Sequence, residues 1–126
     1  MIVADTDVLI DALRGKEPSL GTVRRLIEGA GLATTTVTAF ELLAGARTVR
    51  EREEVDGLLG GMTMLPLDLD SARRAAEVHR ALRAAGVAIG AADRLIAGIA
   101  LAHGGALLTR NVREFGRVSG LGVQSP

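Results

Sequence analysis

With 126 residues, 48% of them hydrophobic and 24% charged, the chain has the length and composition of one folded domain rather than of a disordered segment. The absence of cysteine excludes disulfides and thiolate metal sites, and two histidines are too few for a His-rich zinc site. The balance of 15 basic and 15 acidic residues differs from that of a strong, sequence-independent nucleic-acid binder, which is normally basic.

Short apolar runs that end at polar residues predict strands, and apolar residues at helical spacing between them predict helices. In chain order we expect a strand over 1–4, helices over 8–13 and 22–27, a strand over 32–35, helices over 40–47 and 49–59, a strand over 62–67, a helix over 72–85 capped by Asp68 or Asp70, a buried helix over 91–102, a strand over 106–109 and a fifth strand over 121–124.

Strands that alternate with helices predict an α/β fold, with a central parallel sheet of four or five strands flanked by helices. No linker, repeat or low-complexity tract interrupts the chain, so we expect residues 1–126 to form a single domain. The first residues, MIVADTD, lack the basic start of a secretory signal, and the most apolar stretch, 89–108, contains Asp93, Arg94 and His103. We therefore expect a cytoplasmic protein with no membrane span.

Polar side chains follow the predicted strands at one edge of the sheet, where the carboxyl ends of parallel strands meet. They are Asp5, Thr6 and Asp7 after the first strand, Glu41 after the second, Asp93 at the head of the buried helix, and Thr109, Arg110 and Asn111 after the fourth strand. Carboxylate and amide oxygens suit Mg²⁺ or Mn²⁺, and such ions activate water and stabilise phosphodiester charge without histidine or a nucleophilic side chain.

Each of these residues has a structural alternative. Asp5 or Thr6 can cap the first helix, and Asp7 and Asp11 can be first-turn acids that favour the helix dipole, which is the preferred explanation for Asp11. Thr38-Ala-Phe-Glu41 matches a capping box. Against this, the neighbours of Glu41 are apolar, and an unpaired carboxylate among them is costly unless something binds it.

Asp93 and Asn111 have alternatives of the same kind. Asp93 heads an otherwise apolar helix whose small residues face the sheet, so it is either stabilised by the helix dipole or a ligand, and we favour a ligand. Asn111 can simply shape the turn after the fourth strand. His79 and His103 are interpreted as structural.

Four segments in order, Asp5-Thr-Asp7, Thr-x-x-x-Phe-Glu41-Leu-Leu-Ala-Gly, Gly-Ala-Ala-Asp93-Arg-Leu-Ile-Ala and Leu-Thr109-Arg-Asn111-Val-Arg-Glu-Phe, resemble the PIN domain. The resemblance is closest to VapC-type toxins of prokaryotic toxin–antitoxin operons and covers nearly the whole chain. It implies a PIN-like fold and an endoribonuclease dependent on Mg²⁺ or Mn²⁺, a homodimer as a rule, which a VapB-type antitoxin holds inactive.

By the same resemblance, Asp5, Glu41 and Asp93 bind the metal, and Thr6 and Thr109 lie beside them. A fourth position that is often Asp falls on Asn111, which weakens the second metal position, although the amide carbonyl can still coordinate. Asp7 matches a variable position of the family, so it and Arg110 are expected to support the site rather than to form it.

Other functions remain to be separated from this one. Asp5-x-Asp7 also resembles the acidic pair of haloacid-dehalogenase-like phosphatases and of phospho-accepting receiver domains, but both need a late lysine, and Lys16 is the only lysine in the chain. A PIN-fold binding module without catalysis and an RNA-processing nuclease outside a toxin–antitoxin pair stay open as alternatives.

The RNA target is expected to be structured, and to be recognised by shape and phosphate contacts, because Phe40 and Phe115 are the only aromatic residues. Candidate phosphate contacts are Arg24, Arg25, Arg73, Arg74, Arg94 and Arg110. For the first four, a solvated helical face is the preferred interpretation.

Overall fold

The computed structural model describes residues 1–126, and every predicted strand and helix is present in it. The elements are β1 (Ile2–Ala4), α1 (Thr6–Leu13), α2 (Ser19–Glu28), β2 (Ala33–Thr35), α3 (Thr36–Gly45), α4 (Val49–Gly60), β3 (Thr63–Leu65), α5 (Leu69–Ala84), α6 (Ala91–Ala102), β4 (Ala106–Leu108), α7 (Val112–Phe115) and β5 (Val123–Gln124).

The five strands form one parallel sheet in the order β3-β2-β1-β4-β5. The first strand is therefore the central one, with Ala4 opposite Leu108 of β4 and the backbone N–H of Asp5 donating to the Leu108 carbonyl at 2.9 Å. The strands are shorter than predicted by one to three residues each. The expected α/β class and parallel sheet are confirmed.

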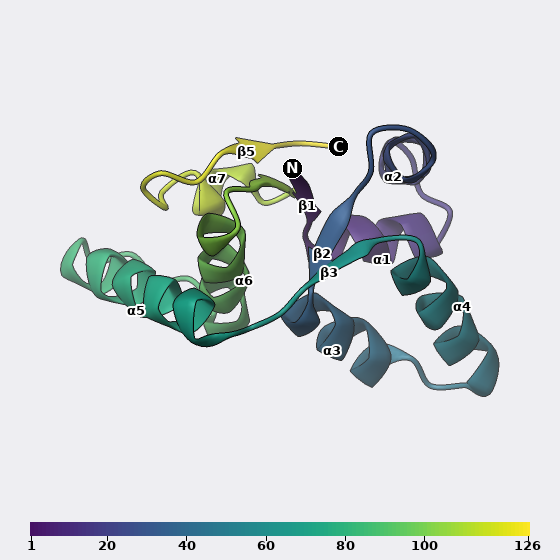
Figure 1. Cartoon of the computed structure of the whole chain (residues 1–126), viewed down its shortest axis with the longest axis horizontal. Coiled ribbons are helices and arrows are strands. Elements are labelled where there is room, and N and C mark those ends of the chain that lie inside the picture. The colour runs from purple at the N-terminus through teal and green to yellow at the C-terminus, as the bar shows by residue number, and fades with distance from the viewer.

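The helices cover both faces of the sheet, so the core has two halves. Alternate strand residues enter different halves, with Val3 in a cluster of 14 buried residues and Ala4 in a cluster of 9. Residues of α5, α6 and α7 contribute to the larger half, and residues of α1, α2, α3 and α4 to the smaller one. Figure 1 shows this division, with α5, α6 and α7 to the left of the strands and α1, α2 and α4 to the right.

The start of α3 differs from the prediction. The hydroxyl of Thr35 accepts the backbone N–H of Thr38 at 3.0 Å, so Thr35 is the N-cap and the helix begins at Thr36 rather than at Phe40. Thr38 therefore lies inside the first turn, and the capping box of Thr38 and Glu41 is wrong. The prediction for α5 is confirmed in its cap, because Asp68 accepts the backbone N–H of Ser71 at 2.9 Å.

Helices α5 and α6 pack so closely that there is no room for a side chain at the position of Gly98. A Cβ atom on Gly98 would lie 2.6 Å from the backbone nitrogen of Ala75, well inside van der Waals contact. Five consecutive residues of α6, from Ile96 to Ala100, are buried here. The crossing fixes the position of α6 on the sheet and, with it, the position of Asp93 in the first turn of that helix. None of the helices is both long and apolar enough to cross a membrane.

Replacing Gly98 by Ala should lower the free energy of unfolding by about 1–3 kcal/mol, because the backbones of α5 and α6 must move apart. Gly57→Ala in α4 is the matched control, since Gly57 is exposed and has no neighbouring atom within 4 Å of the added methyl group. It should raise stability by up to about 1 kcal/mol through helix propensity. Urea unfolding of both variants measures the difference, and equal effects would contradict the close packing.

Candidate active site

Asp5 lies at the carboxyl end of the central strand and is withdrawn from water. Its residue is 4% exposed, and each carboxylate oxygen has one donor: Oδ1 accepts the backbone N–H of Thr6 at 2.8 Å and Oδ2 accepts the hydroxyl of Thr109 at 2.7 Å. Asp5 therefore is the helix cap that the sequence offered as an alternative. The second bond ties it to the end of β4 as well, which a cap alone does not require.

Glu41 reaches the same edge from the second turn of α3. The hydroxyl of Thr6 donates to Glu41 Oε1 at 2.7 Å, and the hydroxyl of Thr38 lies 3.1 Å from that of Thr6 and 3.2 Å from that of Thr35. Since the single hydroxyl proton of Thr6 is used by Glu41, Thr6 accepts from Thr38. This row of threonines links α1, β2 and α3 and fixes the Glu41 carboxylate, so the alternative explanation of Glu41 by a capping box does not apply. Thr38 was missed as a supporting residue because its spacing matched a cap.

Asp93 stands at the same edge without a hydrogen-bond partner of its own, and Glu114 of α7 is close enough for its charge to act on Asp93. The side-chain amide of Asn111 donates to Glu114 Oε2 at 2.8 Å, so Asn111 holds Glu114. Glu114 was not assigned to the site from the sequence, although it follows Asn111 by one helical turn. The role of Asn111 at the metal position stays a prediction, and Glu114 is an additional acid hydrogen-bonded to it.

Asp7 faces the loop after β4. It accepts the backbone N–H of Arg110 at 3.1 Å, and its Oδ2 lies 3.9 Å from Nε of Arg110. The same Nε lies 3.0 Å from Oδ2 of Asp11, which is buried. Asp11 is thus an ion-pair partner rather than a first-turn acid. The Arg110 charge is already neutralised by Asp11 and Asp7, which lowers its value as a phosphate contact.

The burial of these carboxylates raises their pKa values. Burial raises the pKa of Asp5 to about 7, against the lowering effect of the Thr109 hydrogen bond and with a further increase from the charge of Asp7. Burial also raises the pKa of Asp93, as do the charges of Glu41, Glu114 and Asp7. The pKa of Asp7 is raised by burial too, although Arg110 opposes the shift. The charges of Glu41, Glu114 and Asp7 thus act on Asp93, and the charges of Asp7 and Asp93 act on Asp5.

The residues present suit a divalent cation. No three acidic side chains lie close enough together to form a ready-made ion cage. The donors are nevertheless hard oxygens, and no lysine or arginine forms an ion pair with Asp5, Glu41 or Asp93. An ion bound among them would stabilise the charged form of Asp5 in its buried position and would offset the repulsion between Asp93 and its acidic neighbours. Both effects are expected of a Mg²⁺ or Mn²⁺ site.

The chain matches the family described as "PIN domain" over residues 2–121. It belongs to the PIN domain family. The resemblance that the four sequence segments suggested is thereby confirmed.

Among the curated PIN relatives, ribonuclease VapC10 of Mycobacterium tuberculosis is 37% identical over 115 residues, which cover 91% of this chain and 86% of that protein. The tRNA(fMet)-specific endonuclease VapC of Shigella flexneri is 30% identical over 121 residues, which cover 93% of this chain and 91% of the relative. Both relatives therefore align with this PIN domain over nearly their whole length.

Solved structures show the same fold. VapBC from Salmonella typhimurium, solved bound to DNA, matches with a TM-score of 0.88 at 25% identity and covers 98% of this chain and 96% of that chain. VapBC2 from Rickettsia felis, bound to a promoter DNA fragment, has a TM-score of 0.90 at 22% identity, covers 100% of this chain and 99% of that chain, and supports the fold alone.

Asp5 should make the metal-free PIN domain less stable as the pH rises. Its folded pKa of about 7 lies above the ordinary value of 3.8, so the folded state binds the proton more tightly than the unfolded state between these values. The contribution of Asp5 to stability therefore falls as the pH rises from about 4 and is fully unfavourable above about 7. With EDTA present, the wild type should melt several degrees higher at pH 5.5 than at pH 8.

Asp5→Asn is the control for this pH profile, since it cannot ionise. Its melting temperature should exceed that of the wild type at pH 8, and the difference between the two proteins should shrink towards pH 5.5. If the two melting curves shift in parallel across this range, other groups cause the pH dependence.

Removing the Arg110 side chain should leave Asp11 buried without its ion partner. We expect Arg110→Ala to lower the free energy of unfolding by about 1–2 kcal/mol, a value between those of buried and exposed pairs because the Arg110 side chain is 56% exposed. The double variant Asp11→Asn/Arg110→Ala should recover part of this loss. A double-mutant cycle with no coupling energy would show that the ion pair contributes nothing.

Proposed function

We propose that this PIN domain is a metal-dependent endoribonuclease that acts as the toxin of a VapBC-type toxin–antitoxin module. The observation that carries the proposal is the set of carboxylates at the carboxyl edge of the sheet, where Asp5, Glu41 and Asp93 have no basic partner and the charge of Glu41 acts on Asp93. The ribonuclease names of relatives at 30% and 37% identity support the reaction class.

In this proposal Asp5, Glu41 and Asp93 hold Mg²⁺ or Mn²⁺, Asn111 assists through its amide carbonyl, and Glu114 adds an acid beside Asn111. The bound ion would activate water and stabilise the charge of the cleaved phosphodiester. Two threonines of the chain hold the metal-binding carboxylates in place: the hydroxyl of Thr109 orients Asp5, and the hydroxyl of Thr6 orients Glu41. Neither threonine needs to move a proton to or from the substrate for this role.

The partners in the proposal are an RNA substrate, a VapB-type antitoxin and a second copy of the chain. The solved VapBC complex that is 25% identical supports the antitoxin. Phe40, which is 71% exposed, lies with Leu67 beside the first turns of α6, and an exposed aromatic next to other apolar side chains supports a covering protein partner. A cytoplasmic location and a single domain over residues 1–126 stay predictions.

The test of this function is RNA cleavage by the purified chain with and without Mn²⁺. Asp93→Asn should reduce the cleavage rate more than about 100-fold, since loss of groups that merely support metal ligands costs roughly 10- to 100-fold. Glu28→Gln, which changes an exposed acid on α2, is the control and should cleave at the wild-type rate. Sequencing of RNA ends after induced expression identifies the cleaved RNA.

Millimolar Mn²⁺ should also raise the melting temperature of the wild type, because a ligand that prefers the folded state stabilises it. Asp93→Asn should lose most of this increase. Cleavage that is equal in the wild type and in Asp93→Asn, or a wild type that melts at the same temperature with and without Mn²⁺, would refute the metal-dependent nuclease.

A further inference from the structure

Charge is distributed unevenly between two helices of this neutral chain. Helix α4 carries four acidic residues and two arginines, whereas α5 carries four arginines and two acidic residues. Within α5 the two acids, Asp70 and Glu77, lie in the first nine residues, and Glu77 is paired with Arg74 at 3.5 Å. The last turns of α5 therefore carry Arg80 and Arg83, and the one acid near them, Glu77 one turn before Arg80, is paired with Arg74 instead.

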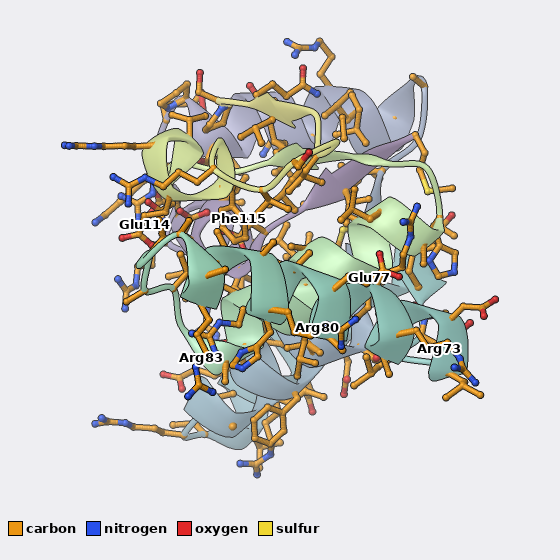
Figure 2. All side chains as sticks on the ribbon, turned by 90° about the vertical axis from the view of Figure 1, so that its left-hand side faces the viewer. Arg73, Glu77, Arg80, Arg83, Glu114 and Phe115 are labelled. Carbon is orange, nitrogen blue, oxygen red and sulfur yellow. The ribbon has the colours of Figure 1, made fainter.

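This basic end of α5 lies next to the end of α6 that bears Asp93. The two helices cross where Gly98 meets Ala75, and nearer the loop between them Nη1 of Arg94 lies 2.7 Å from Nδ1 of His79. The helices are therefore antiparallel, so the C-terminal half of α5 accompanies the N-terminal half of α6. In Figure 2, Arg83 lies at the end of α5 nearer to Glu114, and Arg73 lies at the other end.

Arg94 adds a third positive charge that no acid neutralises. A guanidinium can only donate hydrogen bonds, so Arg94 is the donor and Nδ1 of His79 the acceptor in this contact. The Nε atom of Arg94 is buried and has no hydrogen-bond partner. None of Arg80, Arg83 and Arg94 lies within 4.0 Å of a carboxylate, whereas Arg110, on the other side of the site, is paired with Asp11. We call these three arginines the α5–α6 patch.

The opposite approach to the site is unfavourable for RNA. A groove of about 340 Å³ beside Glu41, between α1, α3 and α4, is lined by Glu41, Glu51 and Glu54 against a single Arg14. A phosphate strand would be repelled from this groove, and the catalytic carboxylates themselves repel phosphate as well.

We propose that the α5–α6 patch is the surface on which this nuclease holds the phosphates of its RNA substrate, an inference that rests on the proposed function. Arg80 and Arg83 are about 4.5 Å apart along the helix axis. Both side chains are long and flexible, so their guanidinium groups can reach neighbouring phosphates of one strand. The strand then runs from the patch, past the first turn of α6, to the carboxylates at the edge of the sheet.

The experiment compares two double variants that remove the same charge. Arg80→Ala/Arg83→Ala removes the exposed part of the patch, and Arg24→Ala/Arg25→Ala removes two exposed arginines of α2, which lies on the other face of the sheet. Binding of labelled, unfractionated transfer RNA is measured by fluorescence polarisation in EDTA, where cleavage does not interfere, over a series of salt concentrations. Cleavage by the wild type with Mn²⁺ is measured separately.

At low salt the patch variant should bind the RNA about tenfold or more weakly than the wild type, and the slope of log Kd against log salt should fall by about 1.5 to 2. The α2 variant should stay within about twofold of the wild type. Equal weakening in both variants, or none in the patch variant, would overturn the proposal. A patch variant that changes its sedimentation from dimer to monomer would also overturn it, because the arginines would then serve a protein interface.

The two proposals can fail separately. If the wild type cleaves RNA and the patch variant binds it normally, only the docking surface is refuted. If the wild type binds RNA through the patch but does not cleave any RNA with Mn²⁺, the docking surface stands and the nuclease function fails.

Discussion

The carboxylate of Asp5 is buried at the end of the central strand. It accepts two hydrogen bonds and forms no ion pair with a lysine or an arginine. Burial of a charge is costly, and here it is offset only in part by the hydrogen bonds from Thr6 and Thr109. The surroundings follow from this constraint. Thr109 ends β4 at the point where its hydroxyl reaches Asp5, and Thr6 begins α1 with its N–H on Asp5 and its hydroxyl on Glu41. A bound cation would lower the free-energy cost of this buried negative charge.

The position of Asp93 depends on the packing of its helix rather than on hydrogen bonds. Asp93 is carried by α6, and α6 is held against α5 by the contact between Gly98 and Ala75. A glycine in the middle of a buried helix lowers helix propensity, but at this place no other residue permits the approach. The same contact brings the C-terminal half of α5 alongside the N-terminal half of α6, which bears Asp93. Close packing therefore sets the distance between the acids and the arginines that we assign to substrate binding.

The parallel sheet and its acidic edge could be predicted from the sequence, because the alternation of short apolar runs with helical segments leaves few topologies, and all parallel strands end on one side. Asp5, Glu41 and Asp93 could be placed at this edge in this way, and their role as metal ligands stays a prediction. The Asp11–Arg110 ion pair and the hydrogen bond between Asn111 and Glu114 could not be predicted, since an acid at helical spacing looks like a surface residue until its partner is known. Asp11 meets Arg110 across 99 positions of the chain, a contact that no local pattern encodes.

The capping box shows the opposite error. Thr38 and Glu41 have the spacing of the motif, but Thr35 is one helical turn earlier and caps the helix instead, so the local pattern had two solutions. The choice between them depends on where β2 ends, and that is fixed by its pairing with β1 and β3. A motif of four residues cannot carry this information.

The opposite charges of α4 and α5 lie on opposite faces of the sheet, because Val55 of α4 packs in one half of the core and Val78 of α5 in the other. A chain with a formal net charge of zero is therefore a dipole. A distant polyanion exerts little net pull on it but does exert a torque, which turns the arginines of α5 towards the polyanion and the acids of α4 away. Orientation thus precedes contact, and it weakens as added salt shortens the screening length, about 10 Å at 0.1 M, below the width of the molecule.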